Sequence, residues 1–410
     1  MFQVHDRKTC RLCGGARLER YLTIDDMPMS DQFLRPGELG KEFRHRLDIY
    51  VCEDCKLSQT LHDVDPGAYY KDYQYSVAQS QHAMNCMQAL AESMIARFEL
   101  KPGNRVLEVG SADGSQLRFF QKAGFEVLGY EPSEALTRVA RENGIATINN
   151  LFTADSIDDI PAEFKPIQAI LLTYTFDHLP DPVAFLRAAA AVLDPENGVL
   201  VIEVHDLDKI LDRYEYCLMM HEHTNYCGAA TMQRLLEKGG MTLIDVDLVP
   251  PEKTRGNSLL AAAALKGSAM AKRAMPDLAL GRLQDIETYR RFGQEVEQSI
   301  ATLRRQLREK KKAGMRLAGY GAGGRGVLTM AAIAEPGIFD YVIDKNPAFH
   351  NLVTPVSHVP VDGIDRVFKD PVDEILVFSH GYINEIRRDL QPFIDRGGRI
   401  ISLLDALQSR

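Results

Sequence analysis

The junction between an apolar run and a glycine-containing turn at residues 105–114 constrains the fold more than any other stretch. It predicts a buried strand over 106–109 and a helix from Gln116, an order that lets backbone N–H groups approach a ligand. A second apolar run, 126–130, ends at Glu131, where a carboxylate can accept hydrogen bonds from both hydroxyls of a ribose. The turn lacks the full Gly-x-Gly-x-x-Gly spacing, which disfavours a dinucleotide site. The alternative is an ordinary turn that binds nothing.

Strands and helices alternate after this junction. Apolar runs at 168–173 and 198–204 predict strands, with a helix over 183–193 between them. Such alternation indicates an α/β fold with a parallel sheet. A second glycine-rich junction at 315–326 is followed by three more apolar runs. We therefore expect a second, C-terminal Rossmann-like α/β unit.

The second glycine-rich turn carries its own candidate site. Gly321, Gly323 and Gly324 could cradle a diphosphate, with Arg325 as the counter-charge. A turn with a purely structural role is the alternative.

Composition excludes several classes of partner. The 410 residues carry a net charge of −9, which disfavours a nucleic-acid substrate. No apolar run approaches the length of a membrane span, and the N-terminus lacks the apolar segment of a signal peptide. We expect a cytoplasmic protein, either a monomer or a homodimer, that binds a small molecule and no membrane.

Two Cys-x-x-Cys pairs stand near the N-terminus. Four thiolates can close a tetrahedral structural zinc site, and a cytoplasmic chain favours metal ligation over disulfides. The long gap between the pairs fits a zinc ribbon with an inserted loop over 22–34 and a strand over 44–51. Reduced core cysteines without metal, or a redox pair, are the alternatives. The predicted ligands are Cys10, Cys13, Cys52 and Cys55.

A tyrosine-rich segment, 69–76, follows this lobe. A loop over the ligand pocket would let Tyr73 or Tyr75 offer a phenol to the substrate. Aromatic packing between two lobes is an equal alternative. His178 follows the strand at 168–173, where open α/β sheets place ligands. It either contacts the substrate or caps the helix that starts near Pro182.

The segment His221-Glu222-His223 is a polar cluster in a chain with 11 histidines. General acid–base work suits it, because a histidine pKa lies near neutrality and an adjacent carboxylate can orient the ring. The i, i+2 spacing is not that of a helical metal pair. A metal role and a satisfied helix N-terminus remain as alternatives.

The first junction resembles the S-adenosylmethionine site of class I methyltransferases. The whole chain resembles the sugar C-methyltransferases that act on nucleotide-activated deoxy-keto sugars in antibiotic biosynthesis. The resemblance rests on the four-cysteine lobe, the Glu-Val-Gly-Ser-x-Asp-Gly turn, the His-Glu-His-x-x-Tyr cluster and the C-terminal Gly-Tyr-Gly-Ala-x-Gly-Arg-Gly turn. It implies S-adenosylmethionine as cofactor, a structural Zn²⁺, and four domains at 1–68, 69–268, 269–313 (a helical connector) and 314–410.

The resemblance also implies roles for individual residues. His223 would be the base that removes the proton beside the sugar ketone, so that the enolate attacks the sulfonium methyl. The other expected catalytic residues are Glu222, Tyr75, His178 and Tyr226. The expected cofactor-binding residues are Glu108, Gly110, Ser111, Asp113, Gly114, Glu131, Pro132, Thr173 and Tyr174. The expected substrate-binding residues are Tyr73, His221, Gly321, Gly323, Gly324 and Arg325.

The chain departs from this family's pattern on the substrate side. Met220 replaces a tyrosine, Tyr174 an asparagine, Arg255-Gly-Asn-Ser258 a His-Gly-Gly-Ser segment, and Ser379-His380 a Trp-Asn pair. An O- or N-methyltransferase acting on another anionic or phosphorylated small molecule is therefore an alternative function. A binding protein with a vestigial fold is another, although Glu108, Asp113 and Glu131 disfavour it.

Overall fold

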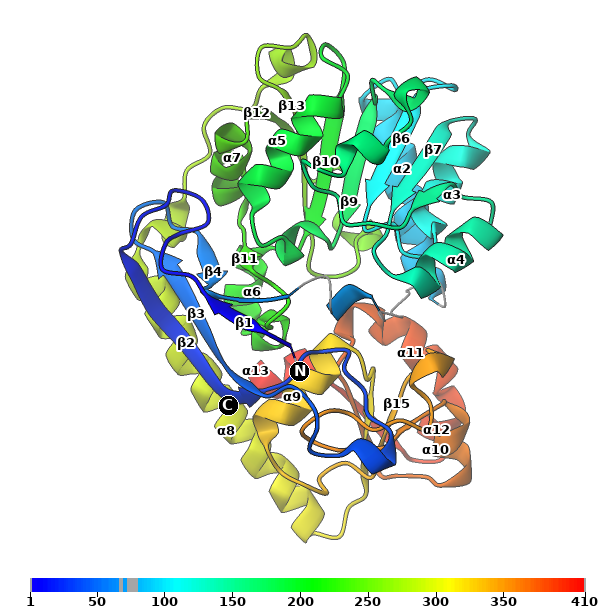
Figure 1. The fold of residues 1–410 in the computed structure, drawn as a ribbon. Helices are drawn as coiled ribbons and strands as arrows, with labels where there is room; N and C mark the ends of the chain where they lie inside the picture. The colour runs from blue at the N-terminus through cyan, green and yellow to red at the C-terminus, as the bar shows by residue number, and fades with distance from the viewer. Residues whose placement is uncertain (1, 66–68, 72–79, 409–410) are drawn as a thin grey trace.

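The computed structural model describes residues 2–65, 69–71 and 80–408. Figure 1 shows a large sheet-and-helix domain at the top, a smaller C-terminal domain below it, and an N-terminal lobe against a long helix at one side. None of the helices within the described ranges is long and apolar enough to cross a membrane.

The large domain is built on a seven-stranded sheet in the order β12-β13-β10-β9-β6-β7-β8. The strands from β10 to β8 are parallel, whereas β13 is antiparallel to both of its neighbours. The sheet is therefore mixed at one edge, where the sequence predicted only parallel strands. The strands are β6 (Arg105–Val109), β7 (Glu126–Tyr130), β8 (Thr147–Ile148), β9 (Ala169–Thr173), β10 (Val199–Val204), β12 (Met241–Val246) and β13 (Leu259–Leu265).

Helices cover the two faces of this sheet, and an apolar core lies under each face. The strands read as continuous apolar runs because both faces are buried. The predicted helices at 116–123 and 183–193 correspond to α3 and α5. The helices of this domain are α2 (Gln81–Arg97), α3 (Ser115–Lys122), α4 (Glu134–Glu142), α5 (Pro182–Val192), α6 (Leu207–Arg213) and α7 (Ala229–Lys238).

The N-terminal lobe holds a four-stranded antiparallel sheet in the order β11-β4-β3-β2. Strand β11 (Asn225–Tyr226) comes from the middle of the chain and pairs with β4 (Ser58–Thr60). The predicted loop over 22–34 is wrong in its first part, which belongs to a strand. Strand β2 (Leu18–Met27) pairs with β3 (His45–Cys52) along most of its length. A separate pair joins β1 (Val4–Asp6) to β5 (His62–Val64).

The C-terminal domain is a five-stranded parallel sheet in the order β16-β15-β14-β17-β18. Its first strand leads through the glycine-rich turn into α9, as the sequence predicted. The strands are β14 (Leu317–Tyr320), β15 (Tyr341–Ile343), β16 (Val361–Asp362), β17 (Glu374–Val377) and β18 (Arg399–Ser402). The helices are α9 (Gly324–Ile333), α10 (Asp365–Lys369), α11 (Ile383–Asp389), α12 (Gln391–Ile394) and α13 (Leu403–Gln408).

The long helix α8 (Ile286–Lys312) ties the N-terminal lobe to the C-terminal domain. Its buried face, which includes Tyr289 and Phe292, packs in one hydrophobic core with Tyr21 of β2 and Leu328 of α9. Gly293 lets β2 approach closely, because an added Cβ would lie 1.9 Å from the Tyr21 carbonyl oxygen. The N-terminal lobe, α8 and the C-terminal domain thus share one hydrophobic core.

Candidate active site

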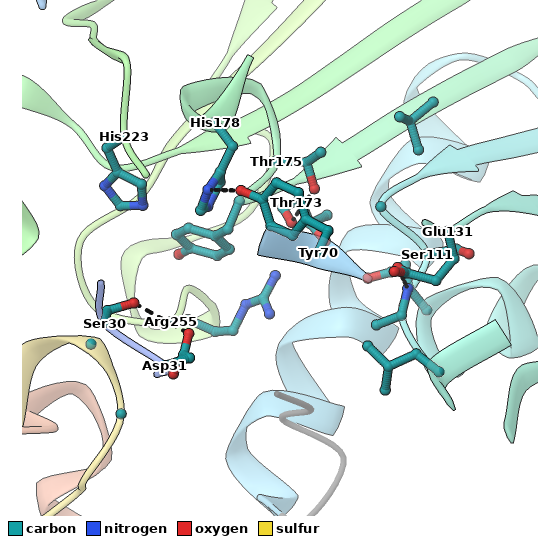
Figure 2. Close-up of a pocket in the computed structure, with 18 of the residues that line it drawn as sticks. Ser30, Asp31, Tyr70, Ser111, Glu131, Thr173, Thr175, His178, His223 and Arg255 are labelled. Atoms are coloured by element: carbon teal, nitrogen blue, oxygen red, sulfur yellow. Dashed lines mark hydrogen bonds between the residues drawn. The ribbon is translucent and has the colours of Figure 1, made fainter. Parts of the chain in front are cut away.

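A single cavity of about 640 Å³ lies where the three parts of the chain meet. Its lining includes Ser30 of the N-terminal lobe, Glu131 and His223 of the central segment, and Arg325 of the C-terminal domain. Figure 2 shows the imidazoles of His223 and His178 at one end of the view and Ser111 and Glu131 at the other. The cavity therefore joins both glycine turns to the histidines.

The first glycine turn and Glu131 form one end of this cavity. The Glu131 carboxylate accepts hydrogen bonds from the backbone N–H groups of Ala112 (2.9 Å) and Ser133 (2.8 Å). Burial raises the pKa of Glu131 to about 6. This carboxylate is thus held at the end of β7 by the turn itself, with Pro132 beside it on the cavity wall.

Two glycines of the turn adopt left-handed backbone conformations, Gly110 at φ +72° and Gly114 at φ +77°. A Cβ on Gly110 would lie 2.3 Å from Thr175 Oγ1, and one on Gly114 would lie 2.8 Å from Ile145 Cγ1. Asp113 also lines the cavity, and its carboxylate accepts a hydrogen bond from the Ser115 N–H at the start of α3.

Two buried polar side chains of the turn have atoms without a partner among the described residues. They are the Ser111 hydroxyl and Oε2 of Glu108. The other oxygen of Glu108 accepts a long hydrogen bond, 3.5 Å, from the Thr173 hydroxyl, and burial raises the pKa of Glu108 to about 8. Orphaned buried polar atoms next to a cavity indicate a polar ligand.

One hydrogen bond fixes the orientation of the His223 ring. Its Nδ1–H donates to the Leu218 carbonyl at 2.9 Å, so Nε2 is the acceptor nitrogen of the neutral tautomer. Nε2 lies 3.8 Å from Oδ2 of Asp177, and both side chains are buried. Burial raises the pKa of Asp177, whose oxygens have no hydrogen-bond partner among the described residues.

Asp177 was not predicted from the sequence. It immediately precedes His178, and the two differ in surroundings: His178 lines the cavity, whereas Asp177 is buried beside Nε2 of His223 and does not line it. His205 completes the cluster, since its ring centroid lies 5.6 Å from that of His223. One ring nitrogen of each histidine and one carboxylate oxygen of Asp177 lie within 4.8 Å of one another. Only the three-dimensional fold brings these three segments together.

His178 contacts the cavity and does not cap a helix. The cap of α5 is Asp181, whose carboxylate accepts from the Ala184 N–H. The ring of His178 lies 4.6 Å from that of His223, and its Nδ1 is hydrogen-bonded to the Tyr70 hydroxyl at 2.5 Å. Tyr70 is the described member of the tyrosine-rich segment that lines the cavity, and Tyr73 and Tyr75 lie outside the described residues.

Three expected site residues lie behind the cavity wall. Glu222 points into the N-terminal lobe, where it accepts hydrogen bonds from the Ser30 N–H and the Tyr69 hydroxyl, so it does not orient His223 as expected. The Tyr226 hydroxyl is hydrogen-bonded to the backbone of Met220 and shapes the loop. His221 contacts His62 instead of a substrate pocket.

The departures from the family pattern gather on the cavity wall. Met220, Tyr174, Arg255 and Ser379 all line the cavity. The Arg255 guanidinium lies 4.4 Å from the centre of the Tyr174 ring and 3.2 Å from Glu203, while the Tyr174 hydroxyl is hydrogen-bonded to Ser258. Tyr174, Arg255 and Ser258 are thus joined by direct contacts on or next to this wall.

The C-terminal glycine turn repeats the geometry of the first. Asp344, at the end of β15, accepts from the N–H groups of Ala322 (2.7 Å) and Asn346 (2.8 Å). Glu131 accepts from the equivalent N–H groups, one in the turn after β6 and one two residues after Glu131 itself. Gly321, Gly323, Gly324 and Arg325 line the cavity beside Asp344. Nε of Arg325 is buried without a hydrogen-bond partner among the described residues.

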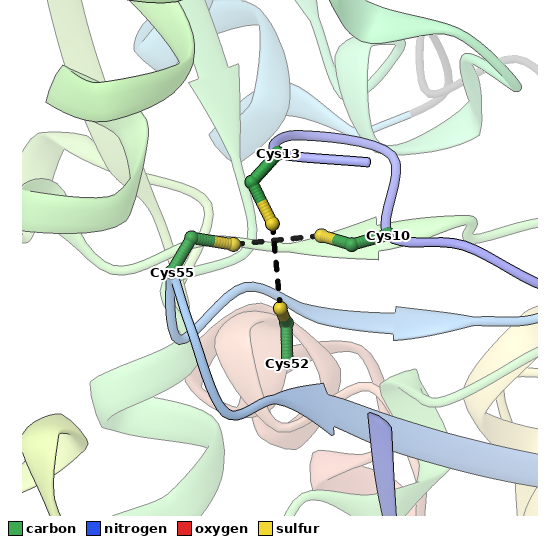
Figure 3. Close-up of side chains that lie close together, drawn as sticks. All are labelled: Cys10, Cys13, Cys52 and Cys55. Atoms are coloured by element: carbon green, nitrogen blue, oxygen red, sulfur yellow. Dashed lines mark hydrogen bonds between the residues drawn. The ribbon is translucent and has the colours of Figure 1, made fainter. Parts of the chain in front are cut away.

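The four cysteines form a compact cluster away from the cavity (Figure 3). The Sγ atoms of Cys10 and Cys55 lie 3.4 Å apart, and those of Cys13 and Cys52 lie 3.6 Å apart. A tetrahedral ion with Zn–S bonds of about 2.3 Å needs about 3.8 Å between sulfurs, whereas a disulfide needs about 2.05 Å. Backbone N–H groups of Leu12 and Gly15 point at two of the sulfurs. The cluster fits a structural Zn²⁺.

Comparison with known proteins follows the same division of the chain. A zinc binding domain model matches residues 10–70, a methyltransferase domain model matches 81–246, and a C-methyltransferase C-terminal domain model matches 256–404. The C-methyltransferase NovU of Streptomyces niveus is 27% identical over 96% of this chain and 94% of its own length. The chain is an S-adenosylmethionine-dependent methyltransferase.

Two further matches cover smaller parts of this methyltransferase. A ubiquinone biosynthesis O-methyltransferase of Xanthomonas campestris pv. campestris is 31% identical over 38% of this chain and 61% of its own length. The PH0226 protein of Pyrococcus horikoshii covers 48% of this chain and 99% of its own at 19% identity, with a TM-score of 0.38.

The residues at the first glycine turn fit the adenosine end of S-adenosylmethionine. Glu131 presents a buried carboxylate to the cavity, which suits ribose hydroxyls, and the unpartnered atoms of Ser111 and Glu108 suit further polar contacts. The bound cofactor supplies an electrophilic methyl group on a sulfonium. The methyltransferase therefore needs a nucleophilic acceptor, and the histidine end of the cavity is where that acceptor would be generated.

Proposed function

We propose that this methyltransferase transfers a methyl group to the carbon beside a ketone of a nucleotide-activated sugar. The observation that carries the proposal is the single cavity that runs from Glu131 past His223 to Arg325. At each end a carboxylate accepts a hydrogen bond from a glycine-containing turn, Glu131 at one end and Asp344 at the other. A nucleoside can therefore be held at each end. The reacting carbon would then lie beside the histidines.

His223 would act as the base at Nε2. Because Nδ1–H is fixed on the Leu218 carbonyl, Nε2 can accept the proton from the carbon beside the ketone. The nearby Asp177 would stabilise the imidazolium that results, as a buried carboxylate does beside a histidine base. General-base help of this kind is worth about 10²–10⁴ in rate.

The developing enolate oxygen needs a hydrogen-bond donor. Tyr70 and His178 are joined by a hydrogen bond and both line the cavity, which supports this pair as the source of that donor. Alignment of the carbon, the methyl group and the sulfur would then provide much of the remaining acceleration.

The sugar and its nucleotide would be selected at the other end. Arg325, with an unpartnered buried Nε, would face the diphosphate at the N-terminus of α9. The wall of Met220, Tyr174, Arg255 and Ser379 would contact the sugar itself. Since this wall differs from the family pattern as a set, we expect a sugar whose substituents differ from those of the usual family substrates.

Deuterium exchange tests the proposal. Nucleotide keto sugars would be incubated in deuterated water with S-adenosylhomocysteine and either the parent enzyme or His223→Ala. The account predicts exchange at one carbon beside the ketone with the parent enzyme and none above background with the variant. In parallel reactions with S-adenosylmethionine as the methyl donor, methylation of an oxygen or nitrogen of a substrate that shows no C–H exchange would overturn carbon methylation.

A further inference from the structure

Three histidines that do not line the cavity lie close together. His45 begins β3, His62 begins β5, and His221 lies just before β11. One nitrogen from each falls within 4.8 Å of the others, and none of the three lines the cavity. The cluster contains no cysteine, so it is separate from the zinc centre described above.

The spacing of the rings is that of ligands around one ion. The ring centroids lie 4.9 Å apart for His62 and His221, 5.3 Å for His45 and His62, and 5.9 Å for His45 and His221. A tetrahedral ion with metal–nitrogen bonds of about 2.0–2.1 Å places imidazole centroids about 5.2 Å apart. The observed values bracket that distance.

Hydrogen bonds to backbone carbonyls direct two of the rings. Nε2 of His221 donates to the Met27 carbonyl at 3.1 Å, and Nδ1 of His45 donates to the Arg46 carbonyl at 2.8 Å. Each bond leaves the opposite nitrogen unprotonated. Metal-ligating histidines typically carry this arrangement, because the carbonyl fixes both the tautomer and the ring direction.

We propose that His45, His62 and His221 bind a second divalent transition-metal ion. Imidazole-only ligation suits Zn²⁺, Cu²⁺, Ni²⁺ and Co²⁺. Three protein ligands leave one position of a tetrahedral ion for water, which can enter because His45 is partly exposed. The ion would link the segment that carries His223 to strands β3 and β5, since its ligand His221 is two residues from His223.

The competing explanation is a hydrogen-bonded histidine pair with no ion. His62 Nε2 and His221 Nδ1 lie 2.7 Å apart, a distance that one shared proton also explains. Under that explanation His45 contributes nothing to metal content. Its substitution therefore distinguishes the two.

The test compares the full-length parent with His45→Ala and with the control His5→Ala, which removes an exposed histidine. Each protein is titrated with Co²⁺ and desalted, and total zinc plus cobalt per chain is measured by mass spectrometry. We expect two ions in the parent and in His5→Ala, and one in His45→Ala. Calorimetry should show the second ion at least about 100-fold weaker in His45→Ala, since even outer-shell changes cost about 10–100-fold.

Two results would overturn this site. One is a parent protein that saturates at a single ion. The other is His45→Ala with two ions bound at the parent's affinity. Because His45 is only partly buried, at the first position of β3, loss of folding should not obscure either result, and near-ultraviolet circular dichroism of the three proteins checks this.

Discussion

Nε2 of His223 lies 3.8 Å from Oδ2 of Asp177, and each side chain is at most 5% exposed. In the proposed mechanism, His223 is the base, and the neighbouring carboxylate stabilises the imidazolium that forms on it. The pair sits where the central domain, the N-terminal lobe and the C-terminal domain converge.

Substitution of the base should separate chemistry from cofactor binding. His223→Ala is expected to lower kcat by about 10²–10⁴, because proton removal loses its acceptor. S-Adenosylhomocysteine should bind within about twofold of the parent, measured by calorimetry, since His223 lies apart from Glu131 in the cavity (Figure 2). A variant with near-parental turnover would exclude His223 as the base.

Asp177→Asn should retain the shape of the site and lose its charge. The imidazolium formed on His223 would then lack its neighbouring anion, and we expect kcat to fall by about tenfold or more. The matched control is Asp181→Asn, which changes a carboxylate that caps α5 outside the histidine cluster. If both variants lose the same modest activity, Asp177 has only a structural role.

Cofactor affinity should depend on pH through Glu131. Burial raises the pKa of this carboxyl to about 6 in the unliganded protein. Ribose hydroxyls donate to the ionised form, so the Kd for S-adenosylhomocysteine should rise as pH falls through 6, approaching tenfold per pH unit. The raised pKa also means that ionising Glu131 costs folding free energy above pH 6, a cost that ligand hydrogen bonds offset.

Glu131→Gln removes the titrating group. This variant should bind the ligand more weakly at pH 8 and show little further weakening between pH 7 and pH 5. Calorimetric titrations at four pH values would measure both curves. An unchanged pH dependence in Glu131→Gln would show that another group controls cofactor binding.

Arg325 should act on the nucleotide and not on the cofactor. Arg325→Ala is expected to lower kcat/KM by about 10–100-fold through KM, because a charged donor facing a diphosphate contributes roughly 1.5–3 kcal/mol. Arg387→Ala, on α11 in the same domain, is the matched control. If Arg325→Ala weakened S-adenosylhomocysteine binding as much as it lowered kcat/KM, Arg325 would not act specifically on the nucleotide.

Removing a zinc ligand should destabilise the lobe that carries β11. Cys13→Ser is expected to lose one zinc per chain and to lower Tm by several degrees, because metal binding contributes folding free energy. Cys86→Ala, which changes a cysteine of α2 outside the cluster, should keep the parent's zinc content. Zinc content by mass spectrometry together with a thermal melt provides the check.

The sequence predicted most of what local pattern controls. The strand–turn–helix junctions at Gly110 and Gly321 and the four-cysteine cluster follow from residue type and spacing. The antiparallel strand β13 was not predicted, because its apolar run looks like any buried strand. The pairing of β11 with β4 was also missed, since it joins Asn225 to Gln59 across the chain.

The histidine site shows the same limit. Sequence adjacency assigned Glu222 to His223, but His221 and Glu222 lie in a turn, and the Glu222 and His223 side chains reach different partners. Glu222 reaches Ser30, and the carboxylate beside His223 is Asp177. Contacts between residues about 46 or 159 positions apart, such as Asp177 with His223 or His62 with His221, leave no periodic signal in a sequence.

A crystal structure with S-adenosylhomocysteine and a nucleoside diphosphate bound together tests the central claim most directly, that one cavity holds cofactor and substrate on either side of the histidines. The account predicts ribose hydroxyls of the cofactor on Glu131, the diphosphate at Gly323 to Arg325, and His223 facing the space between them. A nucleotide bound outside this cavity, or an adenosine away from Glu131, would contradict it.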